Sequence, residues 1–208
     1  AWSALLQRGF SRLADTKTEI NGVNIALEAI RHYAGLKDGL FIKRHPISEE
    51  EFLSTGTAER AKAVSREIGE QLQTLTRLQS EENRLTARQA SLLPWQAMDM
   101  PLELSGTEHV LFRPGVMPAG VDVGQIQVSF GDLAAELLEI SSDKQQKYCL
   151  LICHRQDEES VMECLRPFSF SAVSFQGLTG TADANLTSVS QALAENRKGQ
   201  EDAAAAIA

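Results

Sequence analysis

The sequence has few aromatic residues, an excess of negative charge and no long apolar run. Aromatic residues make up 6% of its 208 residues, including two Trp and two Tyr. This low content, together with many Ala, Leu, Glu, Gln and Arg residues, favours long helices over one large globular core. The net charge of −8 disfavours a surface that binds nucleic acid or anionic membranes, because such surfaces need clustered Lys and Arg.

No apolar stretch approaches the ~20 residues that a membrane-spanning helix needs. The longest such stretch, residues 148–153, has the length of a strand. The N-terminus lacks a basic region followed by an apolar run, which argues against a secretory signal peptide. We therefore expect a soluble chain. Because its two ends fall inside helical patterns, we also expect both to be cut from a longer protein.

Cysteine is scarce, and its three copies give no disulfide framework. This odd number favours a reducing compartment. Cys149 and Cys153 lie four residues apart in a predicted strand and therefore face the same way, whereas His154 falls on the opposite face. Zinc sites usually take their cysteines from tight C-x-x-C turns. We therefore predict buried structural thiols rather than a metal site built with His154 and Cys164.

No catalytic constellation is visible. His32, His45 and His109 are scattered, without an i,i+4 pair. Residues 177–181 (GLTGT) lie between a strand and a helix, a context that can bind phosphate. They lack both G-K-[ST] and G-x-G-x-x-G, and Asp183 stands where an anion would bind, so a plain loop and helix cap are predicted. We expect no enzymatic activity, no cofactor and no metal, and the partner-binding residues stay unknown.

Helical patterns fill the first part of the chain. The first carries an apolar heptad seam with steps of three and four, and it is expected to end at Gly35 or Gly39. Residues 36–47 form a connector, and residues 48–51 (SEEE) form a capping box that starts the next helix. The predicted seam of the first helix comprises Leu13, Thr16, Ile20, Val23, Leu27, Ile30 and Ala34, extended toward the N-terminus by Trp2, Leu6 and Phe10.

The second helix is long. A break is expected in its helix-poor residues 54–57, after which the pattern continues to Leu93, and Pro94 ends it. Its charges have both signs, which is typical of a solvated helix face. Glu82 and Gln89 interrupt an apolar stripe made of Ala61, Val64, Ile68, Leu72, Leu75, Leu78, Leu85 and Leu92.

The next part alternates between strands and helices. The order strand, helix, strand, strand, helix, strand predicts a ferredoxin-like split βαβ lobe, with residues 141–146 as the turn of its central hairpin. Trp95 and Met98 are expected to pack between the helix and this lobe. Phe168 and Phe170 are expected on one face of the last strand and Phe175 on the other. Core packing is predicted for these three residues, and a partner-binding patch is the alternative. The predicted strands are 107–116 (with a Pro-Gly break), 137–142, 147–155 and 168–175, and the predicted helices are 132–138, within an ambiguous stretch 121–136, and 157–165.

A further helix starts at Thr181 or Asp183 and again shows steps of three and four. Its polar Asn196 and Gln200 would weaken the seam but fix its register. We therefore predict an α+β fold in which a long antiparallel coiled-coil stalk carries the lobe at its tip. The predicted domains are a helical stalk, 1–93, an α/β lobe, 94–180, and a returning helix, 181–208. The seam comprises Leu186, Val189, Leu193, Asn196, Gln200, Ala203 and Ile207.

Three stretches resemble one protein family. Residues 27–52 (LEAIRHYAGLKDGLFIKRHPISEEEF) are similar to its helix, K-x-G-L-F connector and helix restart. Residues 92–104 (LLPWQAMDMPLEL) resemble its exit from the stalk, and residues 109–118 (HVLFRPGVMP) its G-x-[IV]-P strand. The family is the cytosolic N-terminal region of subunit I, also called subunit a, of bacterial and archaeal V-type and A-type ATPases.

The resemblance implies a stator arm at the cytoplasmic face of the membrane. The membrane-distal lobe, residues 94–180, would dock the peripheral-stalk heterodimer of the catalytic head, and the arm would link it to the ion channel for ATP-coupled proton or sodium transport. The chain lacks the family's initial strand-helix segment and its transmembrane helices, so ion transfer has no residues here. Two other hypotheses stay open, a regulatory ligand-binding module built on the ferredoxin-like lobe and a self-associating coiled-coil scaffold.

Overall fold

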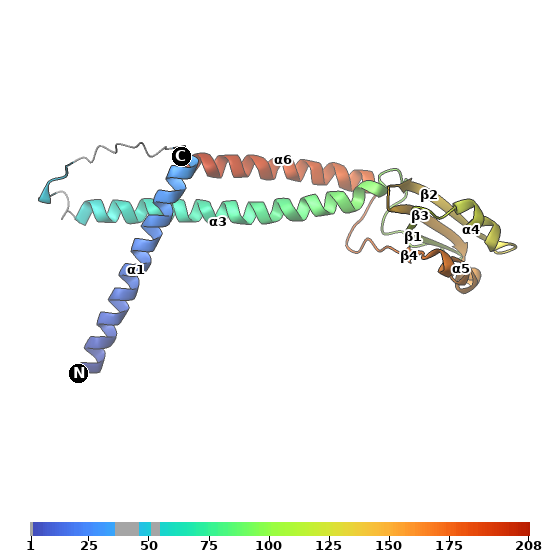
Figure 1. The fold of residues 1–208 in the computed structure, drawn as a ribbon, viewed down its shortest axis with the longest axis horizontal. Coiled ribbons are helices and arrows are strands. Elements are labelled where there is room, and N and C mark those ends of the chain that lie inside the picture. The colour runs from blue at the N-terminus through green and yellow to red at the C-terminus, as the bar shows by residue number, and fades with distance from the viewer. Residues whose placement is uncertain (1, 36–45, 51–54) are drawn as a thin grey trace. The chain divides into compact units, whose positions relative to one another are not determined.

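The computed structural model describes residues 2–35, 46–50 and 55–208 and confirms a mixed α+β protein (Figure 1). Residues 36–45 of the predicted connector and Glu51 of the predicted capping box lie outside the described residues, as do the side chains of Trp2, Leu6 and Phe10. The elements are α1 Trp2–Tyr33, α3 Thr55–Leu92, β1 Val110–Pro118, α4 Val123–Phe130, β2 Ala135–Ser142, β3 Gln146–His154, α5 Glu158–Leu165, β4 Ser171–Ala172 and α6 Ala182–Ile207, with short 3-10 turns at Leu93–Trp95, Arg155–Asp157 and Arg166–Phe168.

The chain divides into two compact units. The first unit, called the helical unit below, comprises residues 1–83 and 194–208, and the second, the sheet unit, comprises residues 84–193. Helices α3 and α6 contribute to both units. The prediction of a lobe at 94–180 between two stalk segments stays a prediction. Within the described ranges, no helix combines the length and the apolar character that crossing a bilayer requires.

The helical unit has a core to which α1, α3 and α6 all contribute. Its buried residues are Ala26 and Ala29 of α1, Ile68 and Leu75 of α3, and Ala203 and Ile207 of α6. The small alanine side chains let α1 approach closely.

The prediction of which α1 residues are buried is wrong. Leu13, Ile20 and Leu27, which were expected to be buried, are exposed, and the buried alanines occupy a neighbouring face of the helix. The predicted end of α1 is right, since Gly35 adopts a left-handed φ of 62° just after the helix.

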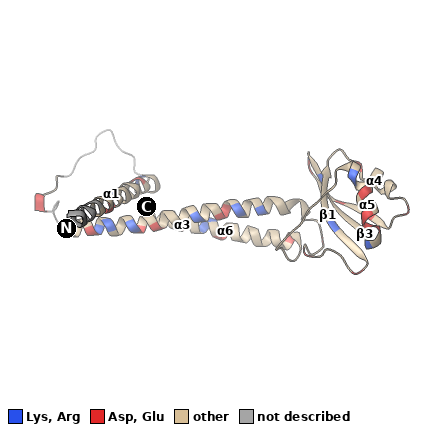
Figure 2. Ribbon diagram, turned by 90° about the horizontal axis from the view of Figure 1, so that it is seen from below, with Lys and Arg blue, Asp and Glu red and all other residues tan. Residues whose placement is uncertain are grey.

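The seam predicted for α6 is confirmed. Its apolar members are buried, and Asn196 is buried with them. In the helical unit, Asn196 donates a hydrogen bond to the main-chain carbonyl of Leu78 on α3, at 3.0 Å. Gln200 and Arg197 both bind the carboxylate of Glu82, at 2.8 and 3.1 Å. Positive and negative side chains are interspersed along α3, as predicted (Figure 2).

The sheet unit contains a four-stranded sheet in the order β2-β3-β1-β4, in which every pair of neighbours is antiparallel. The hairpin between β2 and β3 lies where it was predicted. The carboxylate of Asp143 closes its turn by accepting hydrogen bonds from the main-chain N–H groups of Gln145 and Gln146, at 2.7 and 2.8 Å.

Apolar side chains cover both faces of the sheet. On one face, α4 and α5 pack through Ile126, Phe130, Val161 and Leu165 against strand residues that include Cys149 and Cys153. On the other face, the end of α3 and the start of α6 contribute Leu92, Trp95 and Leu186 to a second cluster. The structure thus confirms that Cys149 and Cys153 face the same way and are buried.

Three sequence-based expectations in this unit are wrong. Strand β1 runs without a break through Pro114 and Gly115, and both pair with β3. Residues 132–134 form no helix, because Gly131, with a φ of 55°, ends α4 and β2 then pairs with β3. The side chain of Asp157 does not cap α5 and instead accepts a hydrogen bond from the N–H of Ala134, at 3.3 Å.

Candidate partner-binding surface

Trp95 organises the end of α3. Pro94 prevents the helix from continuing, and Trp95 falls in a 3-10 turn that points its indole into the sheet unit. The ring is almost fully buried and meets Tyr148 and Phe175 edge to face, with centroid distances of 5.5 and 5.3 Å. Met98 is buried in the same cluster. The prediction that Trp95 and Met98 are packing residues is therefore confirmed.

The next segment, residues 101–107, is tied down at both ends. The N–H of Leu102 donates to the carbonyl of Gly180, at 2.9 Å, and the carboxylate of Glu103 accepts from the N–H of Gly180, at 2.8 Å. Farther along, the carbonyl of Ser105 accepts from the N–H of Phe112, at 2.9 Å. Gly106 has a φ of 146° and leaves no room for a Cβ, which would clash with the carbonyl of Val110. This segment therefore runs along one edge of β1.

A second segment, residues 172–178, covers the same edge farther along. Its strand part, β4, spans only two residues instead of the predicted 168–175. At its start, residues 166–168 form a 3-10 turn and Ser169 adopts a left-handed φ of 56°. At its end, the reason is Pro114. Its carbonyl accepts from the N–H of Val173, at 2.8 Å, but proline has no N–H to return the bond, so the ladder stops there.

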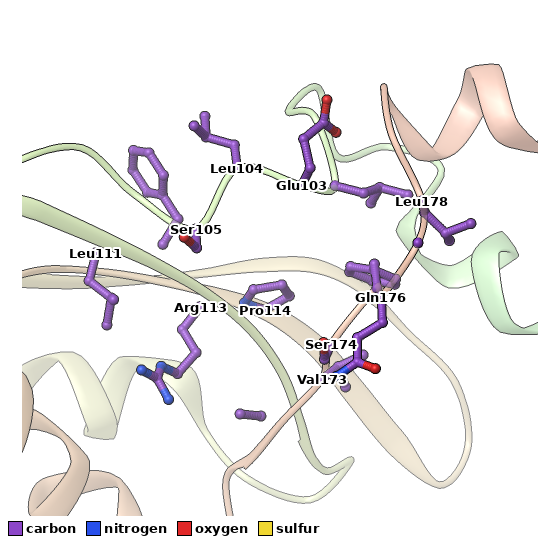
Figure 3. A pocket seen from close by; sticks show the side chains of 15 residues that line it. Glu103, Leu104, Ser105, Leu111, Arg113, Pro114, Val173, Ser174, Gln176 and Leu178 are labelled. Atoms are coloured by element: carbon purple, nitrogen blue, oxygen red, sulfur yellow. The ribbon is translucent and has the colours of Figure 1, made fainter.

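A cavity of about 430 Å³ lies between the two segments and β1 (Figure 3). Glu103 and Leu104 lie on one side of it, and Val173 and Ser174 on the other (Figure 3). The lining is mostly apolar or main-chain, with a few polar side chains at its margin. Its residues are 102–105, 111–114 and 172–178.

The charges at this surface are already paired. The guanidinium of Arg113, on β1, forms an ion pair with the carboxylate of Glu158 at the start of α5. Glu103 is engaged with Gly180. What remains is an open depression that combines apolar side chains with the polar side chains of Ser105, Ser174 and Gln176, a mixture that suits a protein partner.

The ionisable groups of the sheet unit have structural roles. Lys147 and Glu139 pair across β2 and β3 at 2.8 Å, and this hydrogen bond lowers the pKa of Glu139 and raises that of Lys147. Burial raises the pKa of the Cys149 thiol to about 11 and also raises the pKa of Cys153. A thiol of this kind stays protonated near neutral pH and is a poor nucleophile.

The described residues considered for metal binding lie in different parts of the sheet unit and the helical unit. Among the described residues, no group of three or more His, Cys, Asp or Glu side chains is arranged to hold a metal ion. Cys164 packs against the edge of the cluster that contains Cys149 and Cys153, and its thiol donates to the carbonyl of Ser129, at 3.6 Å. His154 stacks on His109 with a centroid distance of 6.3 Å, and its Nδ1 accepts from the N–H of Gln156. His45 lies outside the described residues.

The glycine loop at 177–181 serves the fold. Gly177 and Gly180 have positive φ angles of 73° and 75°. The N–H of Gly180, which an anion would need, is bound to Glu103. The hydroxyl of Thr181 accepts from the N–H of Ala184 at 3.2 Å and so caps α6, as one of the two predicted start residues. Asp183 accepts instead from the side chain of Gln96, at 2.9 Å.

The three phenylalanines lie outside β4, so their predicted place on a strand is wrong, but they fall on the two predicted faces. Phe168 and Phe170 lie against the cluster shared with α4 and α5, and Phe175 lies on the opposite face against Trp95. All three are partly buried against these clusters, and Phe175 also lines the cavity. The sequence does not mark Glu103 and Pro114 as residues that shape the cavity. Glu103 contacts a residue 77 positions away, and Pro114 belongs to a predicted strand break.

Comparison with solved structures gives a distant similarity in fold. No family model matches the chain, and no curated protein sequence matches it. Among solved structures, the fold is similar to one described as the cytoplasmic N-terminal domain of subunit I, homolog of subunit a, of V-ATPase, with 16% sequence identity and a TM-score of 0.44. The match covers 94% of this chain and 65% of that chain.

Proposed function

We propose that this chain is a non-catalytic stator arm of a rotary V-type or A-type ATPase. The observation that carries the proposal is the pairing of α3 and α6. These two helices lead into and out of the four-stranded sheet, and they pack on each other within the sheet unit as well as within the helical unit. The similarity of residues 27–52, 92–104 and 109–118 to subunit I supports the same function.

The proposed role is mechanical. An antiparallel coiled coil resists bending and twisting when its seam is continuous and its register is fixed. In the sheet unit, Leu85 packs against Val189 and Leu193, and in the helical unit, polar contacts to Glu82 and Leu78 restrict sliding. The chain would carry load between the peripheral stalk and the membrane-embedded ion channel, for ATP-coupled transport of protons or sodium ions.

The sheet unit, proposed as a ferredoxin-like split βαβ lobe, would anchor the arm. We place the anchoring contact at the cavity between residues 101–107 and 172–178. Its apolar walls accept the apolar side chains of a helical partner, and the main-chain groups at its margin supply hydrogen bonds. The expected partner is the heterodimeric coiled coil of the peripheral stalk.

Association with that heterodimer tests the proposal. We expect the chain and the purified heterodimer to form a complex of micromolar or tighter affinity in titration calorimetry, and to co-elute in gel filtration. Leu104→Lys, in the cavity wall, should weaken the complex at least tenfold. Leu93→Lys is the matched control, because Leu93 is an exposed leucine in the same unit that does not line the cavity. No association between two folded partners contradicts the proposal.

The cavity also supports a second candidate, a regulatory module that binds a small molecule. A volume of about 430 Å³ falls in the range of ligand sites. A thermal-shift screen with nucleotides and amino acids separates the two functions. A specific ligand that raises the melting temperature, with an effect that Leu104→Lys abolishes, favours the module over the stator arm.

A further inference from the structure

An apolar groove lies between α1 and α3 in the helical unit. Two adjoining cavities of about 340 and 260 Å³ lie along it, and both are lined by Val23 of α1 and Ala61 of α3. Leu27 and Val64 continue the lining of the larger cavity, and Ile20 that of the smaller one. The groove lies outside the sheet unit and plays no part in the contact proposed above.

Large apolar side chains of α1 are exposed in a regular row that runs from Leu13 to the groove residues Ile20 and Leu27. Leu13, Ile20 and Leu27 are 54%, 57% and 48% exposed, and Val64 across the groove is 49% exposed. Single exposed leucines are common on protein surfaces. Here two leucines and an isoleucine recur at intervals of seven residues along one helix, which aligns them in a single row.

This spacing indicates that the groove fits a helix. A seven-residue repeat of apolar residues matches the a positions of a coiled coil, whose partner is another helix. Val23 and Ile30 occupy the d positions of the same repeat and line the groove. Their neighbours Ala26 and Ala29 are buried, so one side of α1 is packed, whereas the adjoining row of Leu13, Ile20 and Leu27 stays exposed.

The charges around the groove indicate the chemistry of that helix. Lys62 forms ion pairs with Glu19, at 3.2 Å, and with Glu59, at 3.5 Å. Lys17 lies about one helical turn from both Leu13 and Ile20, beside the exposed row. Arg60 lines the larger cavity. Among the described residues, no ion pair of Lys17 or Arg60 is seen. Three basic groups (Lys17, Arg60 and Lys62) thus stand against two acidic ones (Glu19 and Glu59), and the margin carries a small net positive charge although the net charge of the chain is −8.

We propose that the groove between α1 and α3 binds an amphipathic helix with an acidic flank. The helix would place its apolar a and d residues over Ile20, Leu27 and Val64 and its carboxylates near Lys17 and Arg60. A second copy of this chain fits less well. A symmetric contact would bring the same basic margin from each copy together, and like charges at an interface oppose association.

A designed peptide tests this proposal. The probe is a helix of about 21 residues, three heptads, with Leu at a and d and Glu at e and g, so that its own like charges keep it monomeric. Titration calorimetry should give binding in the range of tens of micromolar. The same peptide with Lys in place of Glu should bind at least tenfold more weakly. Equal binding of the two peptides, or no binding of the acidic peptide, overturns the proposal.

Variants of α1 locate the contact. The double variant Ile20→Gln, Leu27→Gln should weaken acidic-peptide binding at least tenfold, with the helical circular dichroism signal retained. Ile25→Gln is the matched control, because Ile25 is 46% exposed on the same helix but lines neither cavity. An equal loss in the control overturns the assignment. So does a dimer of the chain alone, seen by sedimentation velocity, that the double variant dissociates.

Discussion

The side-chain amide of Asn196 donates a 3.0 Å hydrogen bond to the main-chain carbonyl of Leu78, and Asn196 is only 6% exposed. This bond joins α6 to α3 within the helical unit. It is a polar contact in an otherwise apolar seam, and it can form in only one register of the two helices. It therefore costs some apolar burial and in return restricts sliding.

Replacing Asn196 with Ala should lower the free energy of unfolding by about 1–2 kcal/mol, through loss of the hydrogen bond and of side-chain contacts. Urea denaturation followed by circular dichroism measures the change. Lys198→Ala, two residues away on the exposed side of α6, is the control and should stay within about 0.5 kcal/mol of the wild type. An Asn196→Ala variant as stable as the control would mean that the bond contributes nothing in solution.

Gly115 and Phe170 give a prediction for the sheet unit. A Cβ at Gly115 would fall within the ring of Phe170. We expect Gly115→Ala to destabilise the chain by roughly 1–3 kcal/mol, because the ring must move out of its packing position. The double-mutant cycle with Phe170→Ala is the check. In the Phe170→Ala background the same substitution should cost much less, and an unchanged cost would show that strain arises elsewhere.

The three cysteines should differ sharply in reactivity. Cys149 and Cys153 are buried, and burial raises the pKa of both thiols, that of Cys149 to about 11. Cys164 is partly exposed. In a native-state reaction with a disulfide reagent at about pH 8, we expect only Cys164 to react quickly, because the thiolate is the reacting form.

Unfolding in guanidinium should make all three thiols reactive. The variant Cys164→Ser should have no fast thiol in the native state. Fast labelling of Cys149 in that variant, identified by peptide mass, would contradict the packing of β3 between the two apolar clusters.

The carboxylate of Asp143 should make the stability of the sheet unit depend on pH in the acid range. Hydrogen bonds from the main-chain N–H groups of Gln145 and Gln146 lower its pKa from the ordinary value of 3.8. Because the folded pKa is the lower one, the stabilisation is fully present above 3.8 and is lost as the pH falls through the folded value.

The variant Asp143→Asn should therefore be less stable than the wild type at pH 7, and the difference should shrink as the pH approaches and passes below 3.8. Urea unfolding at pH 7, 5 and 3 measures it. A difference that stays constant across this range would show that the charge of Asp143 does not support the hairpin turn.

Local signals explain which elements could be predicted. Strand β3 is a short apolar run bounded by polar residues, and the seam of α6 has a regular heptad spacing, so both follow from the sequence alone. The hairpin turn at Asp143 also has a local cause in its side chain. The thiols of Cys149 and Cys153 were placed correctly because strand alternation fixes which way they face.

The errors come from contacts between distant segments. The buried face of α1 is formed by Ala26 and Ala29. These small residues are not part of the heptad row of larger apolar residues, so the heptad pattern pointed to the wrong face. The length of β4 depends on the missing N–H of Pro114, a residue on another strand. The cavity itself arises from two loop segments joined through Glu103 and Gly180, and no local motif marks either of them.

Hydrogen exchange of the chain with and without the peripheral-stalk heterodimer tests the central claim most directly. If the sheet unit anchors a stator arm, the heterodimer should slow exchange in residues 101–107 and 172–178, which border the cavity. Exchange at the α4 end of the same unit, residues 123–130, serves as the internal reference and should not change. Unchanged exchange at both cavity segments, in a sample saturated with the folded heterodimer, would contradict the account.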